Sequence, residues 1–279
     1  MRRVVVTGAS AGIGRATAKA LAERGDRVWL VGRNAQRTEE SAAQIRSLTG
    51  NAHVHHALAD FSSLASVREL AAQLRDEVGP LDVLINNAGV WHQSRRSSHD
   101  GFEDTFAVNH LAPFLLTHLL IPALRAAPRP ARVVFVSSIL HRNVGAFDFD
   151  DLDVERNPYD GLRVYGRSKL ANVLCANEFA RRLRPHGITS NSVHPGNVQT
   201  SIVRDSAFLR IGIRLARPFI RTAEEGARTS VYVASHPALE RISGAYFSNE
   251  RQVPPSAHAR DRSAAEMLWS ISEERVGLA

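Results

Sequence analysis

Short apolar runs alternate with longer segments of mixed polarity along most of the chain. The run Val4-Val5-Val6 is apolar at every position, as expected for a strand of a parallel sheet that is covered on both faces. The longer segments repeat apolar residues at the spacing of helices with one buried face. The predicted strands are 4–6, 26–31, 52–58, 81–85, 132–136, 188–193 and 245–247, and the predicted helices are 12–24, 35–48, 62–78, 98–108, 111–126, one through Tyr165 to 183, and 223–234.

This alternation of strand and helix predicts an α/β fold. We expect a single-domain, Rossmann-type doubly wound parallel sheet of about seven strands, flanked by helices and spanning residues 1–279, with right-handed crossovers. No linker, internal repeat or low-complexity segment divides the chain. The one shift in composition is the acidic stretch 147–153, which precedes the helix of Tyr165.

A glycine-rich turn, Thr7 to Gly14, joins the first strand to the first helix. Its glycines allow a tight turn and a close approach of the backbone to a phosphate, which the unpaired N–H groups of the helix N-terminus would bind. A strand, a glycine turn and a helix in this order are typical of a dinucleotide site, although the spacing Gly8-x-x-x-Gly12-x-Gly14 is not the commonest one. A plain loop is the alternative.

The second predicted strand ends in Gly32-Arg33. A site that prefers NAD usually has an acidic residue there for the ribose 2′-OH, whereas the donors of an arginine suit a 2′-phosphate. The pattern therefore favours NADP, with a solvated Arg33 as the alternative. Ligands bind beyond the carboxyl ends of parallel strands, where Asp60, Asn87 and Ser138 also gather. Asp60 would accept a hydrogen bond from adenine, or else cap the next helix.

Tyr165 and Lys169 lie four residues apart on a predicted helix and share one face. An ammonium beside a phenol lowers the pKa of the phenol and helps it to act as an acid or base. The chain has 35 Lys plus Arg, of which only Lys19 and Lys169 are lysines. A compact ammonium at position 169 is therefore notable, although Tyr-x-x-x-Lys alone also occurs on ordinary surface helices.

The bulk properties exclude several classes of function. The net charge of +7 and the pI of about 10.4 raise the question of nucleic acid, but acidic residues are interleaved with the arginines and no nucleic-acid motif is found. No apolar run is long enough for a membrane span, and the N-terminus does not resemble a signal peptide. A single cysteine, Cys175, fits a cytoplasmic protein. His53, His55 and His56 lack a fourth ligand at a suitable spacing, so we expect no metal site.

Taken together, the motifs resemble those of the short-chain dehydrogenase/reductase family over residues 3–250. The motifs are the glycine turn, Asn86-Asn87-Ala88-Gly89, Asn109, Ser138, Tyr165 with Lys169, and His194-Pro195-Gly196 followed by Thr200. Three features are similar to the retinol dehydrogenase and WW-domain oxidoreductase branch: the 27-residue spacing from Ser138 to Tyr165, the acidic stretch 147–152, and the C-terminal stretches 244–248 and 265–269. The membrane-anchoring N-terminal segment of many retinol dehydrogenases is not found here, so a membrane-resident retinoid is not the expected substrate.

The resemblance implies roles for four catalytic residues. Tyr165 would give a proton to a carbonyl oxygen, and Lys169 would lower the pKa of Tyr165 and hold the nicotinamide ribose. Ser138 would bind the developing alkoxide, with Ser137 as its rival, and Asn109 would bend its helix and anchor a water. The implied cofactor-binding residues are Gly8, Ser10, Gly12, Ile13, Gly14, Arg33, Asn34, Asp60, Phe61, Asn87, Ala88, Gly89, Tyr165, Lys169, Pro195, Gly196, Val198 and Thr200.

The substrate end is less defined by the sequence. The family places a lid after the sixth strand, here at about 200–221, and a C-terminal extension follows at about 251–279. The segment 207–221 is basic and amphipathic, which fits a lid, a docking surface or a helix packed on the core. Trp91, His92 and His141 are expected at the mouth of the pocket.

The predicted function is that of an NADPH-dependent carbonyl reductase acting on a lipophilic or polycyclic ketone or aldehyde. The alternatives are an NAD(P)-dependent dehydrogenase that oxidises a secondary alcohol, retinol or sterol, and a non-catalytic NADP-binding regulatory protein; a nucleotide-sugar epimerase is a weaker one. Relatives also form homo-oligomers through the helices after Asn109 and around Tyr165, a contact that the acidic stretch would block or reshape here.

Overall fold

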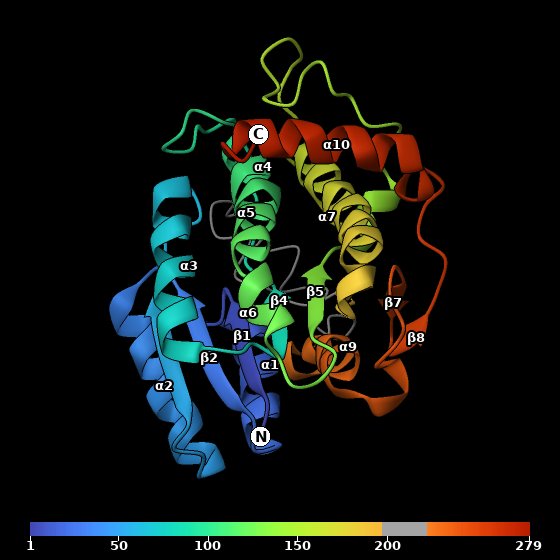
Figure 1. Ribbon diagram of the computed structural model, residues 1–279. Helices are drawn as coiled ribbons and strands as arrows, with labels where there is room; N and C mark the ends of the chain where they lie inside the picture. Colours follow the sequence, from blue (N-terminus) through green and yellow to red (C-terminus); the bar gives the residue numbers. More distant parts are fainter. Residues whose placement is uncertain (197–221) are drawn as a thin grey trace.

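The computed structural model describes residues 1–196 and 222–279 and contains one eight-stranded sheet in the order β3-β2-β1-β4-β5-β6-β7-β8 (Figure 1). Every neighbouring pair of strands is parallel except β7 and β8. The strands are β1 (Arg3–Thr7), β2 (Arg27–Gly32), β3 (Val54–Leu58), β4 (Val83–Asn86), β5 (Arg132–Val136), β6 (Thr189–His194), β7 (Tyr246–Ser248) and β8 (Arg251–Gln252). The strand order reverses between β1 and β4, which is where a doubly wound sheet opens a crevice for a ligand.

Helices cover both faces of this sheet. The longer ones are α1 (Gly12–Glu23), α2 (Ala35–Thr49), α3 (Leu64–Val78), α5 (Ala112–Leu119), α7 (Gly161–Leu183), α9 (Ala223–Ser235) and α10 (Arg262–Arg275). Shorter helical segments are α4 (Asp104–Phe106), η1 (Ala107–Leu111), α6 (Ile121–Arg125), η2 (Ile139–Arg142), η3 (Arg184–His186), η5 (Pro237–Leu239) and η6 (His258–Arg260). The predicted doubly wound α/β sheet is confirmed, and the expectation of about seven strands omitted only the two-residue strand β8.

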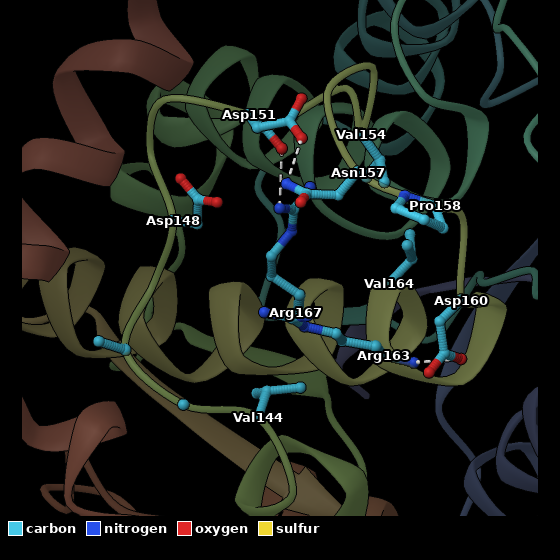
Figure 2. A pocket seen from close by; sticks show the side chains of 12 residues that line it. Val144, Asp148, Asp151, Val154, Asn157, Pro158, Asp160, Arg163, Val164 and Arg167 are labelled. Carbon is cyan, nitrogen blue, oxygen red and sulfur yellow. Dashed lines mark hydrogen bonds between the residues drawn. The ribbon is translucent and has the colours of Figure 1, made fainter.

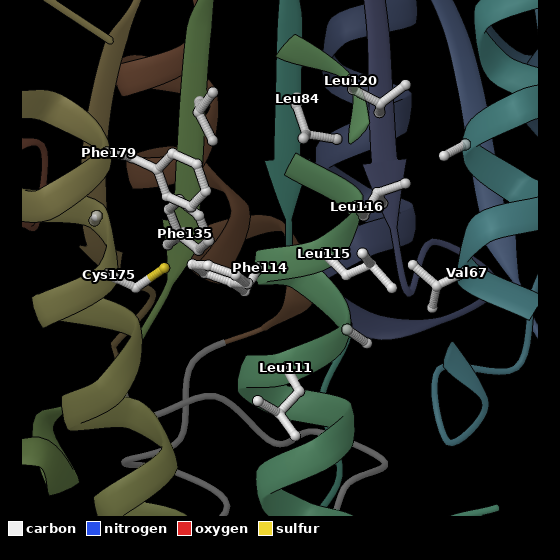
Figure 3. Close-up of a cluster of buried hydrophobic side chains, with 14 of the residues drawn as sticks. Val67, Leu84, Leu111, Phe114, Leu115, Leu116, Leu120, Phe135, Cys175 and Phe179 are labelled. Atoms are coloured by element: carbon white, nitrogen blue, oxygen red, sulfur yellow. The ribbon is translucent and has the colours of Figure 1, made fainter. Parts of the chain in front are cut away.

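Alternate strand residues supply two cores, because successive side chains of a strand point to opposite faces. Val4 and Val6 pack with helices α1, α2 and α9, whereas Val5 packs with α3, α5 and α7. The second core is rich in aromatic rings: Phe114 of α5 and Phe179 of α7 meet with their ring centroids 5.7 Å apart (Figure 3). This packing fixes α7 against the sheet and with it the position of Tyr165 and Lys169.

The helix predicted at 98–108 is wrong in its first half. The helix begins only at Asp104, because the buried carboxylate of Glu103 accepts hydrogen bonds from the N–H groups of Thr105 and Phe106. The expected break at Asn109 is a π-helical turn, η1, and the helix continues through it. Such single π-helical turns inside α-helices are frequent at functional sites.

Helix α10 was not predicted as a helix, and it lies across α7 and α5 (Figure 1). Its Trp269 meets Phe179 and Phe114 edge-on, at centroid distances of 4.6 and 4.9 Å. Its Ser272 lies 2.8 Å from Nε2 of His110, next to Asn109, and burial lowers the pKa of His110 to about 3. The C-terminal helix therefore packs directly behind the π-helical turn. No helix in the described ranges is long and apolar enough to cross a membrane.

The acidic stretch belongs to a longer loop, residues 144–160, which folds over the outer face of α7. The guanidinium of Arg167 donates to the carbonyl oxygens of Asp151 and Leu152, and Asp153 forms a bidentate ion pair with Arg275 of α10. A small pocket of about 50 Å³ lies between this loop and α7, with Asp148 and Arg163 in its lining (Figure 2). Its α7 residues face away from Lys169, so this pocket is separate from the predicted site.

Candidate active site

The glycine turn after β1 is shaped by close backbone contacts. Gly8 has a left-handed φ of +64°, and a Cβ at Gly14 would lie 2.4 Å from both the carbonyl oxygen of Gly8 and Nδ2 of Asn87. The residue before helix α1 is Ala11, which offers no side-chain cap. The first N–H groups of α1 therefore remain available to an anion, as a phosphate-binding turn requires.

The loop after β4 is pinned to this turn. Nδ2 of Asn87 donates to the carbonyl oxygen of Thr7 over 2.8 Å, and the Thr7 hydroxyl accepts the N–H groups of Asn87 and Ala88. The Asn87 amide therefore holds this loop against the glycine turn. The hydroxyl of Thr7 also holds this loop in place, a role that was not predicted from the sequence.

Gly32, at the end of β2, is closely surrounded by side chains of neighbouring residues. A Cβ at Gly32 would lie 2.2 Å from the hydroxyl oxygen of Thr38 and 3.1 Å from Cβ of Ser10. An acidic side chain at position 32 would therefore collide with Thr38. The next residue, Arg33, is 74% exposed, and its guanidinium lies 3.9 Å from the carboxylate of Asp60.

A pocket of about 550 Å³ connects these elements. Twelve of the predicted cofactor-binding residues line it: Gly8, Ser10, Gly12, Ile13, Gly14, Arg33, Asn34, Asp60, Phe61, Asn87, Ala88 and Gly89. Trp91 and His92 also line this pocket, as expected from their position, and so do Arg37 and Arg96, which the sequence analysis missed. The same expectation is wrong for His141, which is fully buried and does not line the pocket. The place of Arg37 in the first turn of the helix that follows Arg33 could have indicated this second arginine.

Two predicted members of the pocket use their side chains locally. The side chain of Asn34 caps helix α2 by accepting the N–H of Arg37. Asp60 accepts hydrogen bonds from the N–H and hydroxyl of Ser62, while Ser63 is the residue that caps α3. Asp60 therefore does not cap the helix, and that alternative for it is wrong.

Tyr165 and Lys169 lie one turn apart on α7, with the Lys169 ammonium 5.3 Å from the centroid of the Tyr165 ring. Lys169 is 2% exposed, and its Nζ donates to the carbonyl oxygen of Val136 over 3.1 Å. A Cβ at Gly89 would lie 3.3 Å from Nζ, so the ammonium reaches the end of the 550 Å³ pocket.

The expected lowering of the Tyr165 pKa is not found. Burial raises the pKa of Tyr165 to about 12 and lowers that of Lys169 to about 8. The reason is that removal from water disfavours the charged form of each group, and the hydrogen bond of Lys169 goes to a carbonyl oxygen rather than to the phenol. At neutral pH Tyr165 thus carries its proton, which a general acid must have.

Asn109, in the π-helical turn, links two parts of the site by hydrogen bonds. Its Oδ1 accepts the N–H of Val90 over 2.7 Å, and its Nδ2 donates to the Val90 carbonyl oxygen and to the Ser168 hydroxyl. Ser168 in turn donates to the carbonyl oxygen of Tyr165. Asn109 therefore holds the loop after β4 and the helix of Tyr165 together.

Ser137 and Ser138 follow β5 and lie in different environments. Ser137 is buried, and its hydroxyl donates to the carbonyl oxygen of Lys169 over 2.7 Å. Ser138 is half-buried, and its hydroxyl oxygen accepts a 3.3 Å hydrogen bond from the N–H of Leu140 at the start of η2. Only Ser138 thus has a hydroxyl proton that is not committed to the helix of Tyr165.

The remaining predicted residues lie elsewhere or outside the described ranges. Pro195 and Gly196 follow the carboxyl end of β6, beside β5, and do not line the 550 Å³ pocket. Val198, Thr200 and the predicted lid at about 200–221 lie outside the described residues. Among residues 1–196 and 222–279, no three His, Cys, Asp or Glu side chains form a group that could hold a metal ion.

Comparison with known proteins agrees with this geometry. A family model described as short chain dehydrogenase matches residues 2–149. Retinol dehydrogenase 12 of Homo sapiens is 44% identical over 275 residues, which cover 99% of this chain and 86% of that protein. WW domain-containing oxidoreductase of Gallus gallus is 41% identical over 280 residues, with coverages of 98% and 67%. A short chain dehydrogenase from Burkholderia cenocepacia J2315, solved in complex with NADP, has a TM-score of 0.69 at 28% identity and covers 93% of this chain and 98% of its own.

The chain therefore belongs to the short-chain dehydrogenase family of oxidoreductases. Within that family it is similar to the branch of the retinol dehydrogenases and the WW domain-containing oxidoreductases, which confirms the resemblance predicted from the sequence.

Proposed function

We propose that the protein is an NADPH-dependent carbonyl reductase that acts on a lipophilic or polycyclic ketone or aldehyde. The observation that carries the proposal is the meeting of Lys169 and Asn109 at Gly89, on the lining of the 550 Å³ pocket, with Tyr165 one turn before Lys169. A general acid, a buried ammonium and a dinucleotide-shaped pocket together suit carbonyl reduction.

The residues of the pocket fit a dinucleotide. The uncapped start of α1 and the crowded Gly8 and Gly14 suit a pyrophosphate, and Arg33 with Arg37 suits a 2′-phosphate. The contact of Gly32 with Thr38 leaves no room for the acidic side chain that a 2′-OH would prefer. These features favour NADP(H) over NAD(H), and the NADP complex of the Burkholderia cenocepacia relative is consistent with that preference.

When bound, the cofactor supplies the hydride to the carbonyl carbon. The chain supplies the proton: the Tyr165 O–H bond breaks as a new O–H bond forms on the carbonyl oxygen, and the Lys169 ammonium stabilises the resulting phenolate. The Ser138 hydroxyl donates a hydrogen bond to the developing alkoxide and keeps its proton, in the manner of an oxyanion hole. Ser137 cannot do the same while it donates to the Lys169 carbonyl oxygen.

The second candidate is an NAD(P)-dependent dehydrogenase that oxidises a secondary alcohol, retinol or sterol. Its support is the 44% identity to retinol dehydrogenase 12. The two directions use the same residues, because Tyr165 can take back the proton that it gives.

We also propose a small-molecule substrate, a cytoplasmic location in which the buried Cys175 stays reduced, and a homo-oligomer that forms away from the part of α7 that α10 covers.

The test is a cofactor-oxidation assay with NADPH and NADH over ketones and aldehydes from small to polycyclic. We expect turnover with NADPH and a lower kcat/KM with NADH. Tyr165→Phe should reduce kcat by about 100- to 10,000-fold, since a general acid contributes on that scale, while NADPH still binds in fluorescence titration. Near-normal turnover of Tyr165→Phe, or an equal preference for NADH, would refute the respective part of the proposal.

A further inference from the structure

The imidazole of His141 lies directly behind Ser138 and is fully buried. Its Nδ1 is 2.7 Å from the carbonyl oxygen of Ser138, and its Nε2 accepts a hydrogen bond of 3.1 Å from the N–H of Ser256. An amide N–H can only donate, so Nε2 carries no proton and Nδ1 must carry the proton of the neutral ring. His141 is thereby fixed in one tautomer that donates to Ser138.

The C-terminal part of the chain makes two further contacts here, one with the ring and one with the next residue. Tyr246 of β7 packs on it with a centroid distance of 4.9 Å, and the neighbouring Arg142 donates to the carbonyl oxygen of Pro254. His141 thus joins the turn after β5 to a segment more than a hundred residues later. Burial lowers the pKa of His141, which keeps the ring neutral near pH 7 and preserves this pattern of hydrogen bonds.

These contacts act on the peptide unit of Ser138. Its carbonyl oxygen also accepts the backbone N–H of His141 over 3.2 Å, so two donors from one residue fix its direction. The side-chain hydroxyl has only a long contact of its own, the 3.3 Å hydrogen bond from Leu140. The direction of the Ser138 hydroxyl therefore depends largely on how firmly its own backbone is held.

We propose that His141 is a positioning residue for Ser138, and that the hydrogen bond from its Nδ1 to the Ser138 carbonyl oxygen aligns the Ser138 hydroxyl for the substrate oxygen. The proposal rests on the proposed function, because it assigns a task to the serine of that site. A displacement of about 1 Å at a reacting group can reduce the rate by about 100-fold, so loss of such an anchor should be visible in kcat.

The test compares His141→Ala with His141→Asn in the NADPH-dependent assay on the full chain. The amide nitrogen of Asn can take the place of Nδ1 and donate to Ser138. We expect His141→Ala to reduce kcat by about 10- to 100-fold with little change in the Kd for NADPH, and His141→Asn to recover most of the loss. When Ser138→Ala is already present, adding His141→Ala should reduce kcat little further, because the two residues act through one interaction.

Three outcomes would overturn the proposal: an unchanged kcat in His141→Ala, a loss that adds fully to that of Ser138→Ala, or an Asn variant no better than the Ala variant. If His141→Ala does not fold, His141→Gln replaces it, since its longer amide reaches toward Ser256 rather than Ser138. Recovery by Asn and not by Gln supports the proposal, and the reverse refutes it. Failure of the proposed function would differ from all of these, because the wild-type protein itself would then show no NADPH-dependent turnover.

Discussion

The two ends of the candidate site each present a cation, and their surroundings differ. Arg33 is 74% exposed, and its guanidinium lies 3.9 Å from the carboxylate of Asp60. Lys169 is 2% exposed, and its ammonium donates to the carbonyl oxygen of Val136 inside the protein. An exposed charge acts through water and is screened by salt, whereas a buried one acts through fixed contacts.

The same difference extends to the regions around them. At the Arg33 end, the pocket is shaped by backbone and by missing side chains, as at Gly8, Gly14 and Gly32. Around Lys169, the site consists of buried polar side chains with defined partners, such as Asn109 and Ser137. We infer that NADPH binding at the Arg33 end is weakened by added side-chain volume and by salt. We also infer that kcat depends on the exact functional groups at the Lys169 end.

The largest effect is expected for Lys169→Arg. A planar guanidinium cannot take the place of an ammonium enclosed by Val136 and Gly89, so kcat should fall by about 100-fold or more. The matched control is Lys19→Arg, since Lys19 pairs with Glu23 on the surface of α1 and its replacement should leave kcat unchanged. Near-normal turnover of Lys169→Arg would break the contrast between the two ends.

The wild-type enzyme should lose activity above about pH 8. The pKa of Lys169 is lowered to about 8 by burial, so its ammonium loses its proton as the pH rises through that value. The pKa of Tyr165 is raised to about 12, so the phenol stays protonated over the same interval and does not cause the loss. The measurement is kcat from pH 6 to pH 10, and a kcat that stays constant to pH 10 contradicts this assignment.

A smaller effect is expected for Gly14→Ala at the cofactor end. The new Cβ would lie 2.4 Å from the Gly8 carbonyl oxygen, and we expect a loss of about 1–3 kcal/mol in the free energy of unfolding, together with weaker NADPH binding. Gly145→Ala is the matched control, because its Cβ would have no neighbour within 4 Å. Chemical denaturation of both variants decides the question, and equal stabilities would show that crowding does not shape this turn.

The smallest effect is expected for Arg33→Ala. An exposed pair with a phosphate should contribute about 1 kcal/mol, so the Kd for NADPH should rise about fivefold at low salt and the difference should shrink in 1 M salt. The Kd for NADH should not change. Arg24→Ala removes the same charge at the far end of α1 and serves as the control. A salt-independent loss would place Arg33 in a more buried contact than its exposure indicates.

Much of the fold was predictable because its signals are local. The strand at 132–136 was predicted with the bounds that the structure has, and the glycine turn and the Tyr165–Lys169 pair follow from spacing within a few residues. The helix at 98–108 was predicted too early, because the period of apolar residues does not reveal that the Glu103 carboxylate starts the helix. Arg37 could have been found from its place in the first turn of the helix that follows Arg33.

The sequence by itself determined the order of strands and helices, the phosphate-binding turn and the chemical groups of the site, since each depends on neighbours along the chain. Only the tertiary structure decided that α10 packs behind Asn109, that Ser137 is engaged by Lys169, and that His141 receives the N–H of Ser256. It also decided that the pKa of Tyr165 is raised and that of Lys169 is lowered, because both groups are removed from water. Burial and long-range hydrogen bonds depend on which distant segments meet, and no local pattern in the sequence encodes that.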